Sequence, residues 1–139
     1  MDVTQIPFAK HIGIEKKEEG TLKLELIPTV QNHIQTIHAS AQYALAETQT
    51  GLFLQLEFPE LEGKVVGLLR GSSVKYKNPA SSTLTAHALL EDESREKFLV
   101  GIHKKSRASI TVMVELRDEN GTITMIGEFN WLVQRIENV

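Results

Sequence analysis

The chain of 139 residues contains no cysteine, and this absence removes several kinds of chemistry at once. Without a thiol there is no cysteine nucleophile, no disulfide framework and no cysteine-ligated metal. No run of apolar residues approaches the roughly 20 that a membrane-spanning helix requires. Basic residues are not in excess either: 15 Lys and Arg against 18 Asp and Glu give a formal charge of −3. That balance argues against a nucleic-acid-binding protein, which usually carries a basic surface.

Several catalytic signatures are also missing from the sequence. It has no phosphate-binding glycine loop, no Gly-x-Ser-x-Gly elbow and no Asp-x4-His hydratase pattern. The histidines lack metal-ligand spacing, so we expect no metal site. The first residues have neither the basic nor the apolar segment of a secretory signal, so we expect a cytoplasmic protein.

The length and composition are those of one globular domain. Hydrophobic residues make up 41% of the chain and charged residues 24%, which is ordinary for a soluble protein. A chain of this length can bury one substantial core but is short for two. We therefore expect a single domain over residues 1–139.

The first half of the chain predicts one strand followed by a long helix. Polar and apolar residues alternate over residues 21–27, which is typical of a half-buried strand. Apolar residues then recur at spacings of three and four over residues 39–56, which predicts a helix that has little polar surface. Ser40 or Thr36 is expected to cap the start of this helix.

The second half predicts strands that enclose this helix. A long strand weakened or bulged at Gly67 and Gly71 comes first, and a short helix is expected after Asp92. Asn120-Gly121 favours the positive φ values of a tight hairpin between the last two strands. A helix that is apolar on most sides must be covered by a curved antiparallel sheet, with help from a second subunit. The predicted strands are residues 64–77, 84–90, 110–116 and 123–133.

Glu47 is the side chain that most needs an explanation. It lies among apolar residues of the predicted helix, and no Lys or Arg occurs between Lys23 and Lys64 to neutralise it. Such a carboxylate either pairs with a distant cation or is kept for chemistry. Asn32 and His38 precede it; taken alone, Asn32 is a turn residue and His38 a helix-start residue satisfied by the backbone.

An ordered set of motifs runs along the chain: Asn32, His38-Ala39, Leu45-Ala46-Glu47 and Tyr76-Lys77-Asn78-Pro79-Ala80. This set resembles the hotdog-fold thioesterases, closest to the phenylacetate-degradation type and its uncharacterised relatives. The resemblance covers nearly the whole chain. It implies an α+β hotdog fold, in which an antiparallel sheet wraps one long central helix. It also implies a homodimer or a dimer of dimers that hydrolyses an acyl-CoA or another acyl thioester, with no cofactor besides the coenzyme A of the substrate.

The resemblance also implies a role for each site residue. Glu47 of one subunit would face Asn32 and the His38-Ala39 turn of the other subunit. Glu47 would act as a general base or as a nucleophile, and the sequence leaves both open. The Asn32 amide and the Ala39 backbone N–H would polarise the thioester carbonyl. Substrate-binding candidates are Ser40, Ser72, Ser73, Lys77 and Asn78.

Two departures from the family pattern keep a second function in view. The usual His-Gly-Gly is His38-Ala39-Ser40 here, and the Ala39 methyl group could crowd a thioester that glycine admits. Some relatives use a Ser or Thr on the strand after the helix to hold the attacking water, and Leu69 falls near that place here. The alternative is therefore a non-catalytic hotdog module that binds an acyl thioester or fatty ligand. A third interpretation is a purely structural dimer domain.

Overall fold

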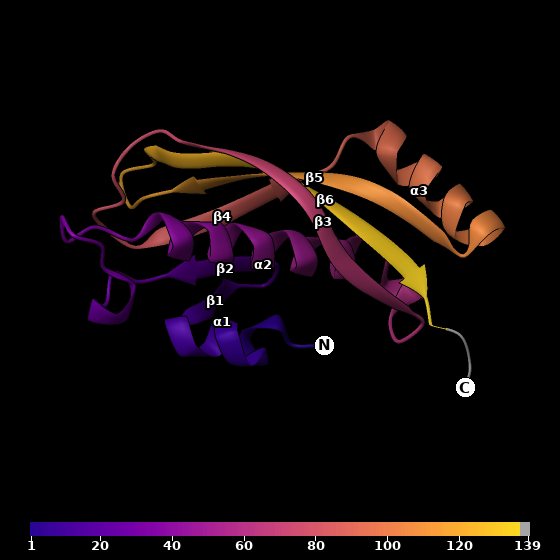
Figure 1. The fold of residues 1–139 in the computed structure, drawn as a ribbon, viewed down its shortest axis with the longest axis horizontal. Coiled ribbons are helices and arrows are strands. Elements are labelled where there is room, and N and C mark those ends of the chain that lie inside the picture. The colour runs from indigo at the N-terminus through magenta and orange to yellow at the C-terminus, as the bar shows by residue number, and fades with distance from the viewer. Residues whose placement is uncertain (137–139) are drawn as a thin grey trace.

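The computed structural model describes residues 1–136 and consists of a six-stranded antiparallel sheet curled around one long helix, α2 (Figure 1). The strand order is β1-β2-β4-β5-β6-β3. A sheet wrapped around a central helix is the hotdog fold, as the sequence predicts. The strands are β1 (Ile14–Glu18), β2 (Thr21–Leu24), β3 (Val65–Tyr76), β4 (Leu84–Leu89), β5 (Arg107–Arg117) and β6 (Ile123–Arg135). The helices are α1 (Pro7–Ile12), α2 (Ala39–Glu57) and α3 (Asp92–Lys105).

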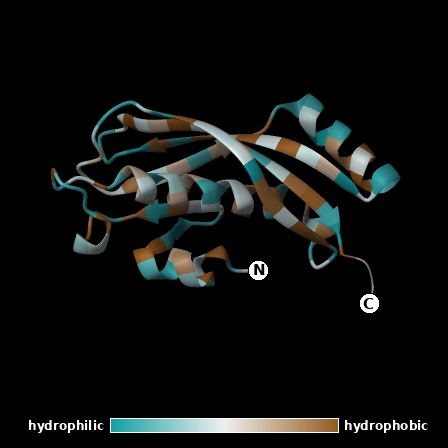
Figure 2. Cartoon of the chain, in the orientation of Figure 1, coloured by the Kyte–Doolittle hydropathy of each residue, from teal (hydrophilic) through white to brown (hydrophobic). Residues whose placement is uncertain are grey.

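The predicted central helix and the final hairpin are both confirmed. Helix α2 begins at Ala39 and ends one residue beyond the expected end. In the turn between β5 and β6, Gly121 adopts φ 80° and its N–H donates to the Asp118 carbonyl at 3.0 Å. Hydropathy alternates along the long strands, as expected for a sheet with one face on the core (Figure 2).

Four local features differ, wholly or in part, from what the sequence predicts. Strand β1 was not expected because all its residues after Ile14 are exposed, which leaves no alternation to detect. Helix α3 has 14 residues and is not short: its two buried residues, Phe98 and Ile102, anchor it to the sheet, while most of its charged residues are exposed. The bulge expected at Gly71 is confirmed by a register shift between Leu69 and Gly71, but the one expected at Gly67 is wrong, because Gly67 is paired regularly with β6. The cap of α2 is His38, whose ring accepts a hydrogen bond from the backbone of the first turn.

Buried amide side chains attach α2 to the surrounding sheet. The Gln49 Oε1 accepts from the Leu22 N–H at 2.9 Å, and its Nε2 donates to the Gly20 carbonyl at 2.8 Å. The Gln42 Oε1 accepts from the Thr124 hydroxyl at 3.0 Å. Each bond contributes about 1 kcal/mol and leaves no buried polar group unpaired. The helix is therefore fixed in rotation, which determines the face that it presents away from the core.

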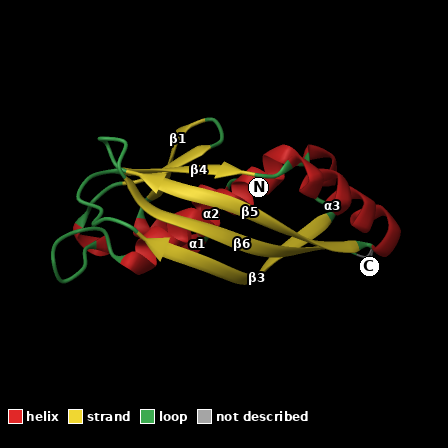
Figure 3. Ribbon diagram, turned by 90° about the horizontal axis from the view of Figure 1, so that it is seen from above, coloured by secondary structure: helices red, strands yellow, loops and turns green. Residues whose placement is uncertain are grey.

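Helix α3 lies over one end of the sheet (Figure 3). Phe98 and Ile102 of α3 are buried, and the Phe98 ring packs against Phe58 at a tilt of 45° with the centroids 4.8 Å apart. A Cβ on Gly101 would lie 2.8 Å from the Ala108 Cβ, so this close approach of α3 to β5 requires glycine.

Strand β3 is an open edge of the sheet, because it pairs only with β6 in the described part of the chain. Most of its residues are exposed. Its large apolar side chains include Val66, which is 44% exposed, and Leu68, which is 52% exposed. A long, apolar, unpaired edge is unusual in a monomeric protein because it invites pairing with another chain.

Candidate active site

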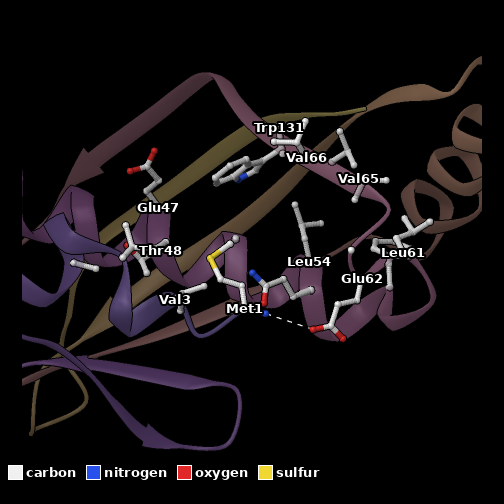
Figure 4. A pocket seen from close by; sticks show the side chains of 18 of the residues that line it. Met1, Val3, Glu47, Thr48, Leu54, Leu61, Glu62, Val65, Val66 and Trp131 are labelled. Carbon is white, nitrogen blue, oxygen red and sulfur yellow. Dashed lines mark hydrogen bonds and ion pairs between the residues drawn. The ribbon is translucent and has the colours of Figure 1, made fainter. Parts of the chain in front are cut away.

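One face of α2 lines a cavity of about 450 Å³ between this helix, strands β3 and β6, and the N-terminal segment (Figure 4). This volume is within the usual range of small-molecule sites, about 300–1,000 Å³. The helix contributes Glu47, Gly51 and Leu54, whose spacing of four and three places them in a single stripe, and Phe58 follows directly after the helix end. The other walls are largely apolar and include Val3, Leu61, Val65, Trp131 and Val133.

Glu47 is partly buried at one end of this cavity, and Leu61 and Val65 lie at the other end (Figure 4). Its carboxylate forms no hydrogen bond or ion pair with any of residues 1–136, and burial raises its pKa above the ordinary value for glutamate. Glu57, on the same helix, is instead paired with Arg95 of α3. Burying part of a carboxylate without a neighbouring cation lowers the stability of the fold. Such groups are often found at functional sites, so Glu47 is the candidate reactive group.

A chain of hydrogen bonds holds Trp131 in the cavity wall beside Glu47. The indole Nε1–H of Trp131 donates to the Thr50 hydroxyl at 2.9 Å, and this hydroxyl donates to the Glu47 carbonyl at 2.7 Å. Thr50 is completely buried. The ring is therefore fixed in orientation by the same turn of α2 that carries the carboxylate.

The start of α2 carries a second group of polar side chains. The His38 Nδ1 accepts from the Ser40 N–H at 2.9 Å, so the neutral ring carries its proton on Nε2. The Tyr76 hydroxyl donates to the Ala39 carbonyl at 3.1 Å, and Tyr43 and Ser72 share a hydrogen bond of 2.8 Å. Burial, aided by the Tyr43 hydroxyl, raises the pKa of Tyr76. These contacts tie the edge strand β3 to the helix N-terminus.

The Asn32 side chain shapes its own loop. Its Oδ1 accepts from the N–H groups of Ile34 and Thr36 at 3.1 and 3.0 Å, and its Nδ2 donates to the Thr36 hydroxyl at 2.8 Å. One amide hydrogen of Asn32 is left over after these bonds. The Asn78 amide similarly donates to the Ile123 carbonyl at 2.8 Å. The other substrate-binding candidates, Ser40, Ser72, Ser73 and Lys77, are exposed on α2, β3 or just after β3.

A single chain does not bring the predicted catalytic residues together. Ala39 and Glu47 are eight residues apart on α2, which is about 12 Å at 1.5 Å per residue. Hydrogen bonds extend about 3 Å, so Glu47 and the His38-Ala39 turn cannot act on one carbonyl within one chain. Their cooperation across two subunits stays a prediction. Among residues 1–136, no three His, Asp or Glu side chains lie close enough to hold a metal ion.

Sequence reasoning missed two cavity residues, Gly51 and Trp131, and also the buried Thr50 that binds the Trp131 indole. Trp131 lies on the predicted last strand, but nothing in the sequence shows that β6 returns beside α2 at this point. A glycine inside a long helix, four residues after the key carboxylate, is the one signal that would have drawn attention to this face.

The fold and the cavity define a hotdog-fold protein. The chain belongs to the family described as a domain of unknown function, DUF4442, whose model matches residues 7–133. No curated protein matches the sequence.

Solved structures share the fold at low sequence identity. A probable thioesterase of unknown function from Pseudomonas aeruginosa superposes with a TM-score of 0.82 at 17% identity, covering 96% of this chain and 91% of that one. A thioesterase from Haemophilus influenzae has a TM-score of 0.74 at 16% identity, covering 98% and 88%. A protein from Bacillus halodurans, solved with CoA, has a TM-score of 0.71 at 19% identity, covering 91% and 74%.

Proposed function

We propose that this protein is an acyl-CoA thioesterase in which Glu47 is the general base or the nucleophile. The observation that carries the proposal is a partly buried carboxylate that has no partner among residues 1–136 and stands at one end of an apolar cavity. A structural acid would be paired, as Glu57 is with Arg95. The fold shared with two proteins described as thioesterases and with one solved with CoA supports the same reaction class.

The chemistry requires a base and a site for negative charge. In the base mechanism, Glu47 takes a proton from water, the hydroxide attacks the thioester carbon, and the carbonyl oxygen becomes an oxyanion. The C–S bond then breaks, the thiolate leaves with the proton returned by Glu47, and a carboxylic acid remains. In the nucleophilic mechanism, the carboxylate attacks the thioester carbon, the C–S bond breaks, and the thiolate leaves and takes a proton from solvent. Water then cleaves the resulting mixed anhydride to the carboxylic acid and free Glu47. General base catalysis is worth about 10²–10⁴ in rate.

The raised pKa of Glu47 favours this role. A carboxylate with a higher pKa is a stronger base, provided that it is still ionised at the working pH. Burial is the cause of the shift, and no charged side chain among residues 1–136 forms an ion pair with Glu47.

A second copy of the chain completes the proposed site. The Ala39 N–H at the start of α2 and the spare Asn32 amide hydrogen would stabilise the oxyanion beside the other subunit's Glu47. Each such donor is worth about 10²–10³ in rate. The open edge of β3, with Val66 and Leu68 exposed, supports pairing of two copies through this strand.

The test follows thiol release from acyl-CoAs of increasing chain length. We expect Glu47→Gln to lower kcat on the best substrate by about 10²–10⁴. Glu60→Gln, which removes an exposed acid outside the cavity, should leave kcat unchanged. If Glu47→Gln hydrolyses as fast as the parent, the proposed mechanism is wrong. If the parent protein binds acyl-CoA without hydrolysing it, the alternative function is favoured: a non-catalytic binding module, which the Ala39-Ser40 departure from His-Gly-Gly suggested.

A further inference from the structure

Gly51 lies in the interior of α2, where glycine is less favourable than alanine because it loses more backbone freedom on folding. A structural reason is therefore expected. At Gly101 in α3 the reason is steric, because a Cβ would lie 2.8 Å from the Ala108 Cβ. At Gly51 no such conflict exists: the nearest atoms to an added Cβ are Trp131 ring carbons at 3.7 Å, an ordinary contact. The space around Gly51 would therefore accept a Cβ atom, yet this position is occupied by glycine.

The missing side chain would project into the cavity. Gly51 lines the cavity from α2, and Gly67 lines it from β3, where an added Cβ would lie 3.5 Å from the same indole ring. Because neither glycine has a side chain, the Trp131 ring is exposed to the cavity between Glu47 and Leu54. The ring is fixed by its bond to Thr50 and is a rigid wall. Any larger residue at Gly51 would divide the cavity here.

The length of the open path gives the size of its occupant. The cavity follows α2 from Glu47 to the helix end at Glu57, next to the lining residue Phe58, which is a rise of about 15 Å. An extended chain advances about 1.2 Å per bond, since a three-bond residue spans 3.3–3.6 Å. This length accommodates about twelve carbons. The walls beyond Glu47 are largely apolar, which suits an unbranched hydrocarbon and offers few partners to a polar or charged chain.

We propose that the cavity along α2 binds an unbranched acyl tail of about twelve carbons, and that Gly51 sets this length by leaving the passage beside Trp131 open. This inference rests on the proposed function for the position of the thioester at Glu47. The binding of the tail itself can be measured without hydrolysis. A side chain at Gly51, four residues or about 6 Å from Glu47, would leave space for only about five carbons.

The test replaces Gly51 by methionine, an unbranched side chain flexible enough to lie along the cavity. Each buried methylene favours binding roughly fourfold. We therefore expect Gly51→Met to lower the ratio of kcat/KM for dodecanoyl-CoA to that for butyryl-CoA by more than about 10-fold. Gly51→Ala, which keeps the helix favourable, should lower the ratio less. The control is Leu56→Met, which places the same side chain on the exposed face of α2 and should not change it.

A second readout needs no catalysis. Trp131 is the only tryptophan of the chain, so its fluorescence reports directly on the cavity. Dodecanol, a neutral probe, should shift the emission to shorter wavelength in the parent and in Leu56→Met, and not in Gly51→Met. Thermal unfolding of each variant confirms that it is folded.

The two readouts separate the two proposals. If dodecanol binds as described while no acyl-CoA is hydrolysed, the tail site stands and the thioesterase proposal fails. If the parent hydrolyses acyl-CoAs but Gly51→Met leaves the chain-length ratio unchanged, the tail inference is overturned. A parent protein whose Trp131 emission does not respond to dodecanol also overturns it, as would occur if a second copy filled the cavity.

Discussion

Replacing Thr50 by valine should break the link between Trp131 and α2 without changing the volume of the side chain. Thr50 is completely buried, and its hydroxyl accepts the only hydrogen bond that the indole N–H makes to residues 1–136. The bond is partly buried, so leaving its donor unpaired costs up to the roughly 1–3 kcal/mol of a fully buried donor. We therefore expect Thr50→Val to lower the free energy of unfolding by that amount, measured by urea denaturation at pH 7.

A double-mutant cycle shows whether the indole is the cause. With Trp131→Phe no N–H remains to be left unpaired, so Thr50→Val should then cost less than about 1 kcal/mol. Thr48→Val is the matched control, because the Thr48 hydroxyl donates only to the Ala44 carbonyl of its own helix and should not couple to Trp131. An equal cost of Thr50→Val in both backgrounds would refute the assignment of Trp131 as a wall fixed by Thr50.

Three further predictions concern the cost of charge, the packing of α3 and the sheet edge. Because burial raises the pKa of Glu47, folding opposes its ionisation: the stability of the parent relative to Glu47→Gln is greatest below the unfolded pKa of about 4.3 and falls as pH rises through the folded pKa. Urea denaturation should therefore show that the free energy of unfolding of Glu47→Gln, relative to that of the parent, is higher at pH 8 than at pH 4. The same difference at both pH values would contradict this. Gly101→Ala should destabilise the protein by about 1–3 kcal/mol because its methyl group meets Ala108 at 2.8 Å, and an unchanged unfolding midpoint would show that α3 can move away. Leu68→Lys adds a charge to the edge of β3 and should weaken self-association in sedimentation velocity; undiminished dimerisation would place the interface elsewhere.

The predictable parts of the fold are those with strong local patterns. Helix α2 follows from apolar spacing, and the β5–β6 hairpin follows from Asn120-Gly121. Strand β1 could not be predicted because it is an exposed edge with charged residues on both faces. Its existence depends on pairing with β2, which is a tertiary effect.

The candidate site divides in the same way. The lack of a local cation near Glu47 is visible in the sequence, and no cation from elsewhere in residues 1–136 reaches it. The cavity could not be predicted, because its walls come from segments as far apart as Val3 and Trp131. The predicted contribution of Asn32 and Ala39 depends on a second chain and stays a prediction.

The central claim is that the Glu47 carboxyl is sheltered from water without a compensating positive charge. The most direct measurement is a ¹³C NMR titration of the glutamate side-chain carboxyls, with the Glu47 resonance assigned from Glu47→Gln. The account predicts a Glu47 pKa above the ordinary value of about 4.3, moving back toward that value when the fold is lost in urea. A Glu47 pKa at or below the ordinary value would mean that the group is solvated or paired with a cation, and would contradict the account.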